Sequence, residues 1–360
     1  MWIITAPESS PSAPASEDSI ALIDRARCAG GTWSSEGEQL MRWPKRFKLH
    51  EAAAPKPTTP ETMRGVPPQL DFTAKPKVDS YDLRPVVSFS GGRTSAFMAS
   101  VLLDVFHGEV DFIFMDTGAE HPKTYEFIQR CDQHFGLNLV CLRGRFNQPL
   151  GKSHTYEVVS SSDIGPDNGP FAEMMSKYGT PTVNSAWCTS RMKEETHGKY
   201  CNDTYGKDAY ATWIGIRADE PKRLKRMGRD PRLRFLAEVS DAGKPDILEW
   251  WSNQPFDLEI PEHLGNCVFC IKKSIAKLAR ATNEEPELMR MFTACIADAN
   301  PRPDLSRPYP KEVMFRGKNT LESLQELGQV ANPEYLDQMT KGSHACEESC
   351  EIVDLEVDED

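Results

Sequence analysis

The segment that decides the fold is PVVSFSGGRTSAFMASVLL, residues 85–103. An apolar run that reads as a buried strand, residues 84–89, stops at a Ser-Gly-Gly turn. A run with the apolar spacing of a helix, residues 94–106, follows at once. Glycine lets the backbone approach a ligand, and the N–H groups of a first helical turn attract anions. The arrangement therefore predicts a phosphate site, and a plain turn of the same composition is the alternative.

Two common phosphate-binding motifs are excluded at this loop. The kinase-type motif G-x-x-x-x-G-K-[ST] requires a Lys that does not occur here, and the dinucleotide motif G-x-G-x-x-G is absent as well. The two glycines offer backbone N–H groups, and nearby hydroxyl groups add side-chain donors. These hydroxyls belong to Ser90, Thr94 and Ser95.

Strand-like and helix-like segments alternate after this loop. We expect further strands at residues 110–115, 137–142 and 209–216, and a helix at 122–135 with Pro122 in its first turn. Strands that alternate with helices form right-handed βαβ units and a parallel sheet. The predicted fold class is therefore α/β, with a mostly parallel sheet flanked by helices.

The composition divides the chain into four parts. Residues 1–80 are rich in Pro, Ala, Ser and Glu and read as a low-complexity, largely irregular leader. Residues 81–275 contain the alternating pattern. Residues 276–342 have helical spacing of apolar residues and form a predicted helical extension. Residues 343–360 form an acidic tail.

Composition also limits the classes of function. Hydrophobic residues make up 39% of the chain and charged residues 27%, which suits a globular core. The formal net charge of −12 argues against a protein that coats nucleic acid, although a local basic patch is compatible with it. No apolar run approaches the roughly 20 residues of a transmembrane helix, and the N-terminus lacks the pattern of a signal peptide. We therefore expect a cytoplasmic protein without a membrane partner.

Ten cysteines are spread along the chain, and Cys267 and Cys270 form a C-x-x-C motif. Cysteines dispersed in this way fit metal binding better than a disulfide framework. Two thiolates at this spacing can hold one metal or cluster, and Lys272 and Lys273 would stabilise their negative charge. A cluster, a zinc ion, a redox dithiol and plain structural thiols are the options.

Several short motifs lie in the alternating region. The loop SFSGGRTS is similar to the motif S-G-G-x-D-S, and MDTGAEHPKTYEFI at 115–128 is similar to D/N-T-G-x-x-x-P-x-T. WCTSRMK at 187–193 and IGIRADEPKR at 214–223 follow, and NCVFCIKKS at 266–274 contains the C-x-x-C. Together these motifs resemble the phosphoadenosine phosphosulfate (PAPS) reductase-like branch of the PP-loop ATP pyrophosphatase superfamily, over residues 84–275.

The resemblance implies a Rossmann-like, HUP-type fold and an adenine nucleotide, either ATP or a PAPS-like molecule, as ligand. The residues implied to bind the phosphates are Ser90, Gly91, Gly92, Arg93, Thr94 and Ser95. Asp116, Thr117 and Gly118 follow the second strand, where open α/β sheets bind ligands, and are implied to lie near the nucleoside. Glu120 is expected at a metal or at a helix start.

The resemblance also implies a metal centre and two catalytic residues. Its iron–sulfur members imply that Cys188 joins Cys267 and Cys270 around a [4Fe–4S] cluster, with one iron open to sulfide or substrate. The fourth ligand stays open among Cys201, Cys346 and Cys350. The implied catalytic residues are Lys193 and Arg217, the latter placed to meet a phosphate or sulfate. No role is assigned to Cys131, Cys141 and Cys295, which fall on apolar faces.

One position departs from the pattern of the branch. The usual Asp of the S-G-G-x-D-S loop is Thr94 in this chain. In hydrolysing members an acidic residue there helps to hold magnesium, so Mg²⁺ is a further candidate cofactor. The threonine argues against vigorous ATP cleavage, whereas it leaves the binding of adenylate phosphates intact.

Three functions fit these features. The first is ATP-dependent sulfur transfer through an adenylylated substrate, as in DNA phosphorothioation and tRNA thiolation proteins. The second is thiol-dependent reduction of PAPS or adenylyl sulfate to sulfite, although the Cys-Gly-Leu-His element and the paired Cys-Cys motifs of such reductases are absent. The third is a nucleotide- and cluster-binding partner protein without turnover, which Thr94 favours.

A basic run, RADEPKRLKRMGRDPRLRF at 217–235, interrupts the acidic composition. It reads as a loop or short helices, because Gly228 and Pro231 break it. A solvated face is one interpretation; a lid over a phosphorylated ligand, or a contact to a nucleic-acid backbone, is the other. A nucleic-acid substrate and a sulfur donor protein are therefore candidate partners. The oligomeric state is left open, with a dimer as one option.

Overall fold

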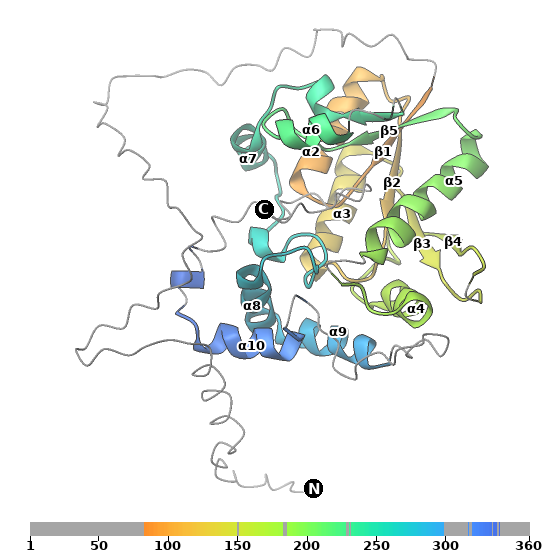
Figure 1. The fold of residues 1–360 in the computed structure, drawn as a ribbon. Helices are drawn as coiled ribbons and strands as arrows, with labels where there is room; N and C mark the ends of the chain where they lie inside the picture. Colours follow the sequence, from red (N-terminus) through yellow and green to blue (C-terminus); the bar gives the residue numbers. More distant parts are fainter. Residues whose placement is uncertain are drawn as a thin grey trace, which may run out of the picture. The chain divides into compact units, whose positions relative to one another are not determined.

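The computed structural model describes residues 83–149, 151–182, 186–227, 230, 232–298, 316, 319–332, 334–336 and 338 (Figure 1). All of them belong to one compact unit, residues 69–360. The predicted leader and the predicted acidic tail lie outside the described residues.

The described residues form a sheet with helices between its strands. The strands are β1 (Arg84–Ser88), β2 (Asp111–Met115), β3 (Val140–Arg145), β4 (Thr155–Val159), β5 (Tyr210–Ile214) and β6 (Leu233–Phe235). The α-helices are α2 (Arg93–Val105), α3 (Pro122–Phe135), α4 (Gly169–Tyr178), α5 (Glu195–Tyr205), α6 (Pro221–Met227), α7 (Lys244–Ser252), α8 (Ile275–Glu284), α9 (Pro286–Asp298) and α10 (Leu321–Val330). A π-helix spans Cys188–Glu194, and two 3₁₀ turns span Leu236–Glu238 and Glu262–Leu264.

The strand order in the sheet is β4-β3-β2-β1-β5-β6. Every pairing is parallel except that of β3 with β4, which is antiparallel. The chain moves outward from β1 to β3 and then returns to pair β5 with the other side of β1. The order therefore reverses between β1 and β5, and such a switch point is where open α/β sheets place their ligands.

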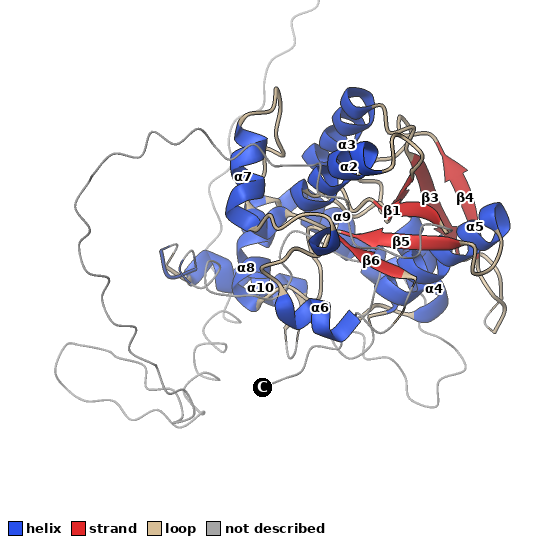
Figure 2. Ribbon diagram, turned by 90° about the horizontal axis from the view of Figure 1, so that it is seen from above, coloured by secondary structure: helices blue, strands red, loops and turns tan. Residues whose placement is uncertain are grey.

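Alternating side chains of the strands build two cores. Val86 and Ile113 pack on one face with Cys201 of α5. Val87 and Phe112 belong to the larger cluster on the other face, which α2, α3 and α7 complete (Figure 1, Figure 2). The side-chain period of two in a strand divides neighbouring residues between the faces, so a central strand such as β1 or β2 needs apolar residues at most positions.

The predicted α/β class and the mostly parallel sheet are confirmed. Helices α2 and α3 and strands β1, β2 and β5 lie where the patterns predict them, within about two residues. The third strand begins later than predicted, because residues 137–139 have no regular structure: Asn138 has φ 52° and the Leu139 N–H donates to the Asp132 side chain. Strands β4 and β6 were not predicted.

Candidate functional site

The glycine loop joins β1 to α2 at the switch point. Gly91 has φ +80°, and a Cβ placed there would lie 2.8 Å from Ile128 Cδ1 of α3. Only glycine therefore fits, both for its backbone conformation and for its close approach to α3. Gly92 is the N-cap of α2, and no described side chain caps it. The first turn of α2 thus presents backbone N–H groups, as the anion-site prediction requires.

The hydroxyl groups of the loop mainly hold its shape. Ser95 Oγ accepts from the Ser90 N–H at 3.2 Å and from Ser90 Oγ at 3.0 Å, and donates to Gly92 O at 2.9 Å. Thr94 is buried, and its Cγ2 lies 3.4 Å from the position of a Cβ on Gly215, after β5. Ser95 and Thr94 therefore fix the loop against its own backbone and against the neighbouring strand end.

Arg93 anchors the loop to a distant segment. Its Nε lies 2.7 Å from Asp257 Oδ1 and its Nη2 lies 3.0 Å from Asp257 Oδ2, a bidentate ion pair. The carbonyl of Arg93 also accepts a 3.0 Å hydrogen bond from the indole of Trp251. The guanidinium predicted to bind phosphate is therefore engaged with the segment that follows α7.

Asp116, Thr117 and Gly118 follow β2 and lie in a buried polar network. Asp116 accepts hydrogen bonds from the Gly118 N–H (2.9 Å), from the Tyr125 hydroxyl (2.9 Å) and from Arg143 Nε (2.7 Å). The Thr117 hydroxyl donates to Glu120 at 2.8 Å, and the Tyr125 hydroxyl also reaches Glu120 at 2.8 Å. The network holds the carboxyl end of β2 rigid.

Burial of two acids at one site shifts the pKa values of this network. Burial, together with the negative charge of Glu120, raises the pKa of Asp116 to about 6, although Arg143 opposes the shift. Burial, with the two carboxylates next, raises the pKa of Tyr125 well above its usual value. Asp116 is therefore a carboxyl group that exchanges a proton near neutral pH.

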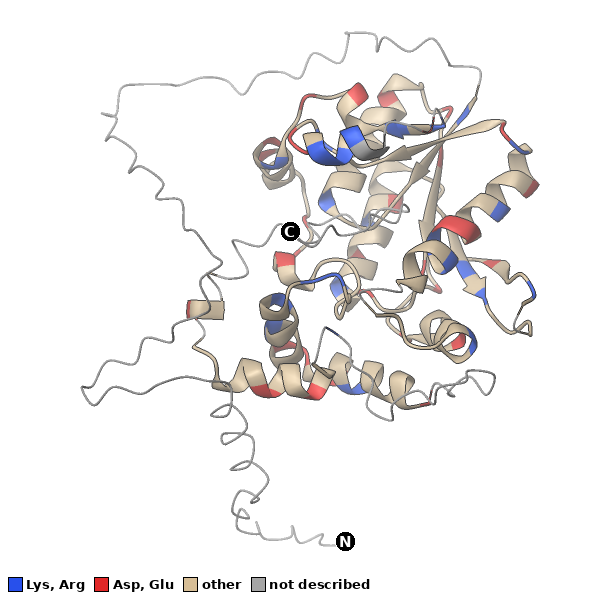
Figure 3. Ribbon diagram, viewed as in Figure 1, with Lys and Arg blue, Asp and Glu red and all other residues tan. Residues whose placement is uncertain are grey.

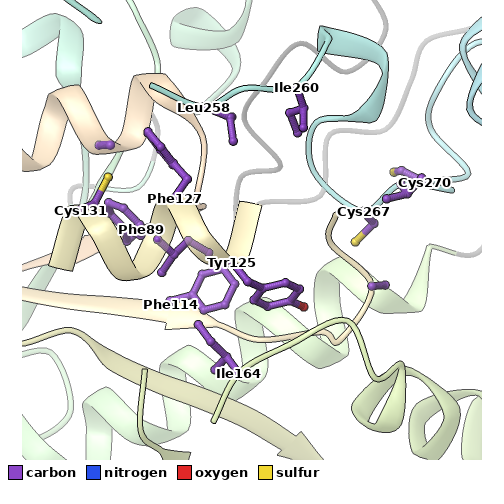
Figure 4. Packing of buried hydrophobic residues seen from close by; sticks show 14 of the residues in the cluster. Phe89, Phe114, Tyr125, Phe127, Cys131, Ile164, Leu258, Ile260, Cys267 and Cys270 are labelled. Atoms are coloured by element: carbon purple, nitrogen blue, oxygen red, sulfur yellow. The ribbon is translucent and has the colours of Figure 1, made fainter. Parts of the chain in front are cut away.

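The C-x-x-C segment packs directly on this network. Glu120 and Cys267 form an antiparallel β-bridge, and the Val268 N–H donates to Ala119 O at 3.0 Å. Cys267 Sγ lies 3.5 Å from Glu120 Oε1 and 3.5 Å from the Thr117 hydroxyl. In Figure 4 the Tyr125 hydroxyl points toward the side of the cluster on which Cys267 and Cys270 lie.

The three predicted metal ligands line one pocket, which we call the thiol pocket. The space between its lining residues, open solvent included, is about 430 Å³. Its lining residues include Cys188, Cys267, Cys270, Lys193, Lys272 and Thr117. Cys188 is the first residue of the π-helix Cys188–Glu194, a rare helix type that occurs frequently at functional sites. Residues predicted from three separate motifs are thus brought together.

The two lysines after the C-x-x-C differ in role. Lys273 is buried and its Nζ donates to His263 O at 2.7 Å and to Val268 O at 2.9 Å. Lys272 lines the thiol pocket and contacts the Thr189 hydroxyl at 3.3 Å. Lys273 therefore holds the shape of the C-x-x-C turn, whereas Lys272 contributes charge to the pocket.

Of the three candidates for a fourth ligand, only Cys201 belongs to the described part of the chain, and it does not line this pocket. Cys201 lies in the core on the α5 face of the sheet, and burial raises the pKa of its thiol to about 12. Cys346 and Cys350 lie outside the described residues. Among the described residues, no three His, Cys, Asp or Glu side chains form a group that could hold a single metal ion. Cys131 and Cys141 are buried, as expected for structural thiols.

Arg217 lies just past β5 and is buried. Its Nε lies 2.8 Å from Asp219 Oδ1, and its backbone N–H donates to Glu220 Oε2 at 3.0 Å. Its position at the switch point agrees with the motif, but it lines neither the thiol pocket nor the pocket beside the glycine loop. Its catalytic role stays a prediction.

The basic run forms α6 and β6, and much of its charge is neutralised. Figure 3 shows Lys and Arg gathered on α6. Arg223 pairs with Glu220, Arg232 with Asp208 at 2.9 Å, and Arg234 with Glu238 at 3.3 Å. Lys222 and Lys225 are exposed. The run therefore presents less positive charge than its composition indicates.

Tyr125 and Arg143 are site residues that the sequence analysis did not identify. Tyr125 bridges Asp116 and Glu120, and Arg143 pairs with Asp116. A signal existed for Arg143, because it lies near the carboxyl end of β3, beside β2 in the sheet. No comparable signal existed for Tyr125, which reads as a helix residue.

The fold and the site define the class of protein. Residues 84–157 match the phosphoadenosine phosphosulfate reductase domain. This chain belongs to that family, as a PAPS reductase-like member of the PP-loop superfamily. Members of the family are usually enzymes, and its nucleotide-binding domain agrees with the switch-point loop described above. No described helix has the length and apolarity needed to span a bilayer.

The particular relatives come from a phage and an archaeon. The chain is 45% identical over 285 residues to the uncharacterized nin region protein ORF290 of Escherichia phage lambda, covering 76% of this chain and 97% of that protein. Two uncharacterized proteins of Methanocaldococcus jannaschii are 27% and 29% identical over 249 and 219 residues. The alignments cover 66% and 57% of this chain and 46% of each archaeal protein.

Proposed function

We propose that this protein is an adenine-nucleotide-binding enzyme that catalyses ATP-dependent sulfur transfer, with a [4Fe–4S] cluster held by Cys188, Cys267 and Cys270. The observation that carries the proposal is the adjacency of two pockets. Gly91 and Asn266 line a pocket beside the glycine loop, and Cys267, the next residue along the chain, lines the thiol pocket. Nucleotide phosphates and thiols would therefore meet at one end of the sheet.

The reaction has two steps. An oxygen of the substrate attacks the α-phosphorus of ATP, and pyrophosphate leaves with the electrons of the broken P–O bond. A sulfur nucleophile then attacks the atom that bears the adenylylated oxygen, and AMP leaves. The N–H groups at the start of α2 would bind the phosphate charge, and Lys193 and Lys272 would stabilise negative charge in the thiol pocket.

The thiol pocket supports a cluster over a single zinc ion. Thiolates bind one zinc at about 2.3 Å, so the sulfur atoms must converge closely on a point. No such group exists among the described side chains, although the three cysteines line one pocket. A cluster accepts thiolates that are further apart, and when bound it would supply an iron able to hold a sulfur atom.

The metal part of the proposal is tested by anaerobic reconstitution with iron and sulfide. We expect a visible charge-transfer absorption and about four irons per chain in the wild type. Cys188→Ala, Cys267→Ala and Cys270→Ala should each lose most of the iron, whereas Cys295→Ala, a thiol outside the pocket, should keep it. A colourless zinc protein would contradict the cluster.

The catalytic part is tested by pyrophosphate release from ATP with reconstituted protein and DNA or tRNA. Release that depends on the nucleic acid supports sulfur transfer, whereas nucleotide binding without release supports a partner protein without turnover. PAPS reduction is the second candidate, favoured by the domain match at residues 84–157. Sulfite release from PAPS would establish it in place of sulfur transfer.

A further inference from the structure

A second pocket lies where two helix N-termini meet a crossing segment. Its lining residues are Gly91, Gly92, Arg93, Thr124, Leu258, Ile260, Pro261, Glu262, Gly265 and Asn266. The space between these residues, open solvent included, is about 260 Å³. Helix α2 begins at Arg93 and helix α3 at Pro122, so both helix dipoles direct partial positive charge here. We call this space the phosphate pocket.

Thr124 carries a buried hydroxyl that the protein does not use. The residue is 2% exposed, and its Oγ1 has no hydrogen-bond partner among the described residues. Its Cγ2 would lie 3.2 Å from a Cβ on Gly91, so the side chain lies against the glycine loop. A buried hydroxyl without a partner destabilises a protein, and a rotation of about 120° about the Cα–Cβ bond would move this hydroxyl to the position that the methyl group occupies beside Gly91.

Asn266 lines the same pocket from the crossing segment. It is 7% exposed and has φ 56°, in the left-handed region that asparagine tolerates better than most residues. A carboxamide offers two N–H donors without a negative charge. Its neighbour Cys267 lines the thiol pocket, so the Asn266–Cys267 peptide spans the boundary between the two pockets.

The pocket's one carboxylate does not repel an anion strongly. Glu262 Oε2 accepts from Lys244 Nζ at 2.8 Å, and its Oε1 accepts from Lys277 Nζ at 3.0 Å. These two ammonium groups more than balance its charge. The lining therefore combines two helix N-termini with a neutralised carboxylate, which suits a polyphosphate.

We propose that Thr124 and Asn266 are the side-chain donors to the phosphates of the bound nucleotide, and that Asn266 links phosphate binding to the position of Cys267. This proposal rests on the nucleotide binding proposed above. Thr124 would exchange an unused hydroxyl for a charge-assisted hydrogen bond when the nucleotide binds. Asn266 would change its backbone or side-chain position with the phosphates, and Cys267 would follow through the shared peptide.

Thr124→Val gives the sharpest test, because it should raise the stability of the nucleotide-free protein and lower its affinity for ATP. Valine keeps the shape and removes the hydroxyl, so the free protein should unfold at a higher temperature. The same variant should bind ATP about tenfold more weakly, measured by calorimetry on the full-length chain. Binding of adenosine, which has no phosphate, should not change. Wild-type affinity for ATP in this variant would overturn the role of Thr124.

Asn266 is tested by two substitutions that share its backbone preference. Asn266→Asp is isosteric and adds a negative charge, so ATP binding should weaken at least tenfold. Asn266→Gly keeps the positive φ without a donor and should weaken binding less. Equal affinities of the wild type and Asn266→Asp would overturn the role of Asn266. Loss of ATP binding by the wild type itself would instead refute the proposed function.

The link to Cys267 has its own readout. The accessibility of Cys267 is measured as its rate of alkylation in the cluster-free protein. Cys188→Ala and Cys270→Ala remove the other two thiols of the pocket from the measurement. ATP should change that rate at least severalfold in the wild type and not in Asn266→Gly. An unchanged rate in the wild type, under conditions where ATP is bound, would refute the link.

Discussion

Cys267 Sγ lies 3.5 Å from Glu120 Oε1, although 147 residues separate the two along the chain. Their backbones form an antiparallel bridge at the same point. A candidate metal thiol is therefore fixed to the loop that follows β2, and through Thr117 and Tyr125 to Asp116. The residues that follow β2 and the thiol pocket share one hydrogen-bond network, so a change in one should affect the other.

Glu120→Ala should destabilise the protein more than any nearby surface change. It would remove the carboxylate that accepts from the buried Thr117 hydroxyl, at about 1–3 kcal/mol for a buried polar group left unpaired, whereas the Tyr125 hydroxyl would keep Asp116 as its acceptor. Glu120→Gln keeps an acceptor and should lose less. Urea unfolding measures both, with the exposed Glu109→Ala as a control expected to change stability by less than about 0.5 kcal/mol. Equal stability of wild type and Glu120→Ala would show that the network is not formed.

The raised pKa of Asp116 predicts a falling contribution to stability as pH rises. The folded state holds a proton up to a pKa of about 6, whereas the unfolded carboxyl releases it near 3.8. The contribution is therefore complete below pH 3.8 and is lost as pH rises through about 6, by up to about 3 kcal/mol. The difference in unfolding free energy between the wild type and Asp116→Asn isolates it from other groups. A difference that stays constant between pH 4.5 and 7 would refute the shift.

Gly91→Ala should impair both folding and nucleotide binding. The alanine would adopt φ +80° and place its Cβ 2.8 Å from Ile128 Cδ1. Gly108→Ala is the matched control, since it has φ +82° but no atom within 4 Å of its Cβ. Backbone strain should lower the free energy of unfolding of both variants by about 1 kcal/mol. Gly91→Ala should show a further loss of stability from the contact with Ile128, and it alone should bind ATP weakly. Thermal unfolding and ATP titration measure the two effects, and identical behaviour of the pair would contradict the close approach to α3.

Substitutions of Lys273 and Lys272 should have different effects, because Lys273 supports the C-x-x-C turn and Lys272 contributes charge to the thiol pocket. Lys273→Ala removes the donor to two carbonyl groups, so the turn should loosen and the reconstituted protein should lose iron and unfold at a lower temperature. Lys272→Ala should leave the unfolding temperature nearly unchanged and alter the cluster's redox potential instead. Iron content, unfolding temperature and potential are measured together on both variants. The reverse pattern would show that the roles are exchanged.

The sequence predicted the elements with strong local patterns. Local sequence patterns favour the observed structure at β1, the Gly-Gly turn, α2 and α3. The spacing of apolar residues and the residue types at the element ends agree there, so the local sequence is enough to predict these elements. Strands β4 and β6 were missed because β4 is an edge strand with mostly exposed residues and β6 has three residues. Such strands depend on their neighbours in the sheet more than on their own sequence.

The site was predicted in part for the same reason. Motifs identified the glycine loop, the Asp116 segment and the three cysteines, and the structure brings Cys188, Cys267 and Cys270 to one pocket. Cys201 was a wrong candidate for this pocket, because α5 presents it to the opposite face of the sheet. The Glu120–Cys267 bridge could not be predicted, since no local pattern specifies a pairing across 147 residues.

The long separation between Glu120 and Cys267 sets an order of events during synthesis. The ribosome releases β1, the glycine loop, β2 and α3 well before it has made the C-x-x-C segment. Domains generally fold as units from the N-terminal side during synthesis, so the glycine loop can form on a nascent chain whose thiol pocket still lacks two of its three cysteines. Loading of the proposed cluster would therefore be a late step of maturation, because a chain that stalls before residue 267 lacks two of the three cysteines proposed to hold it.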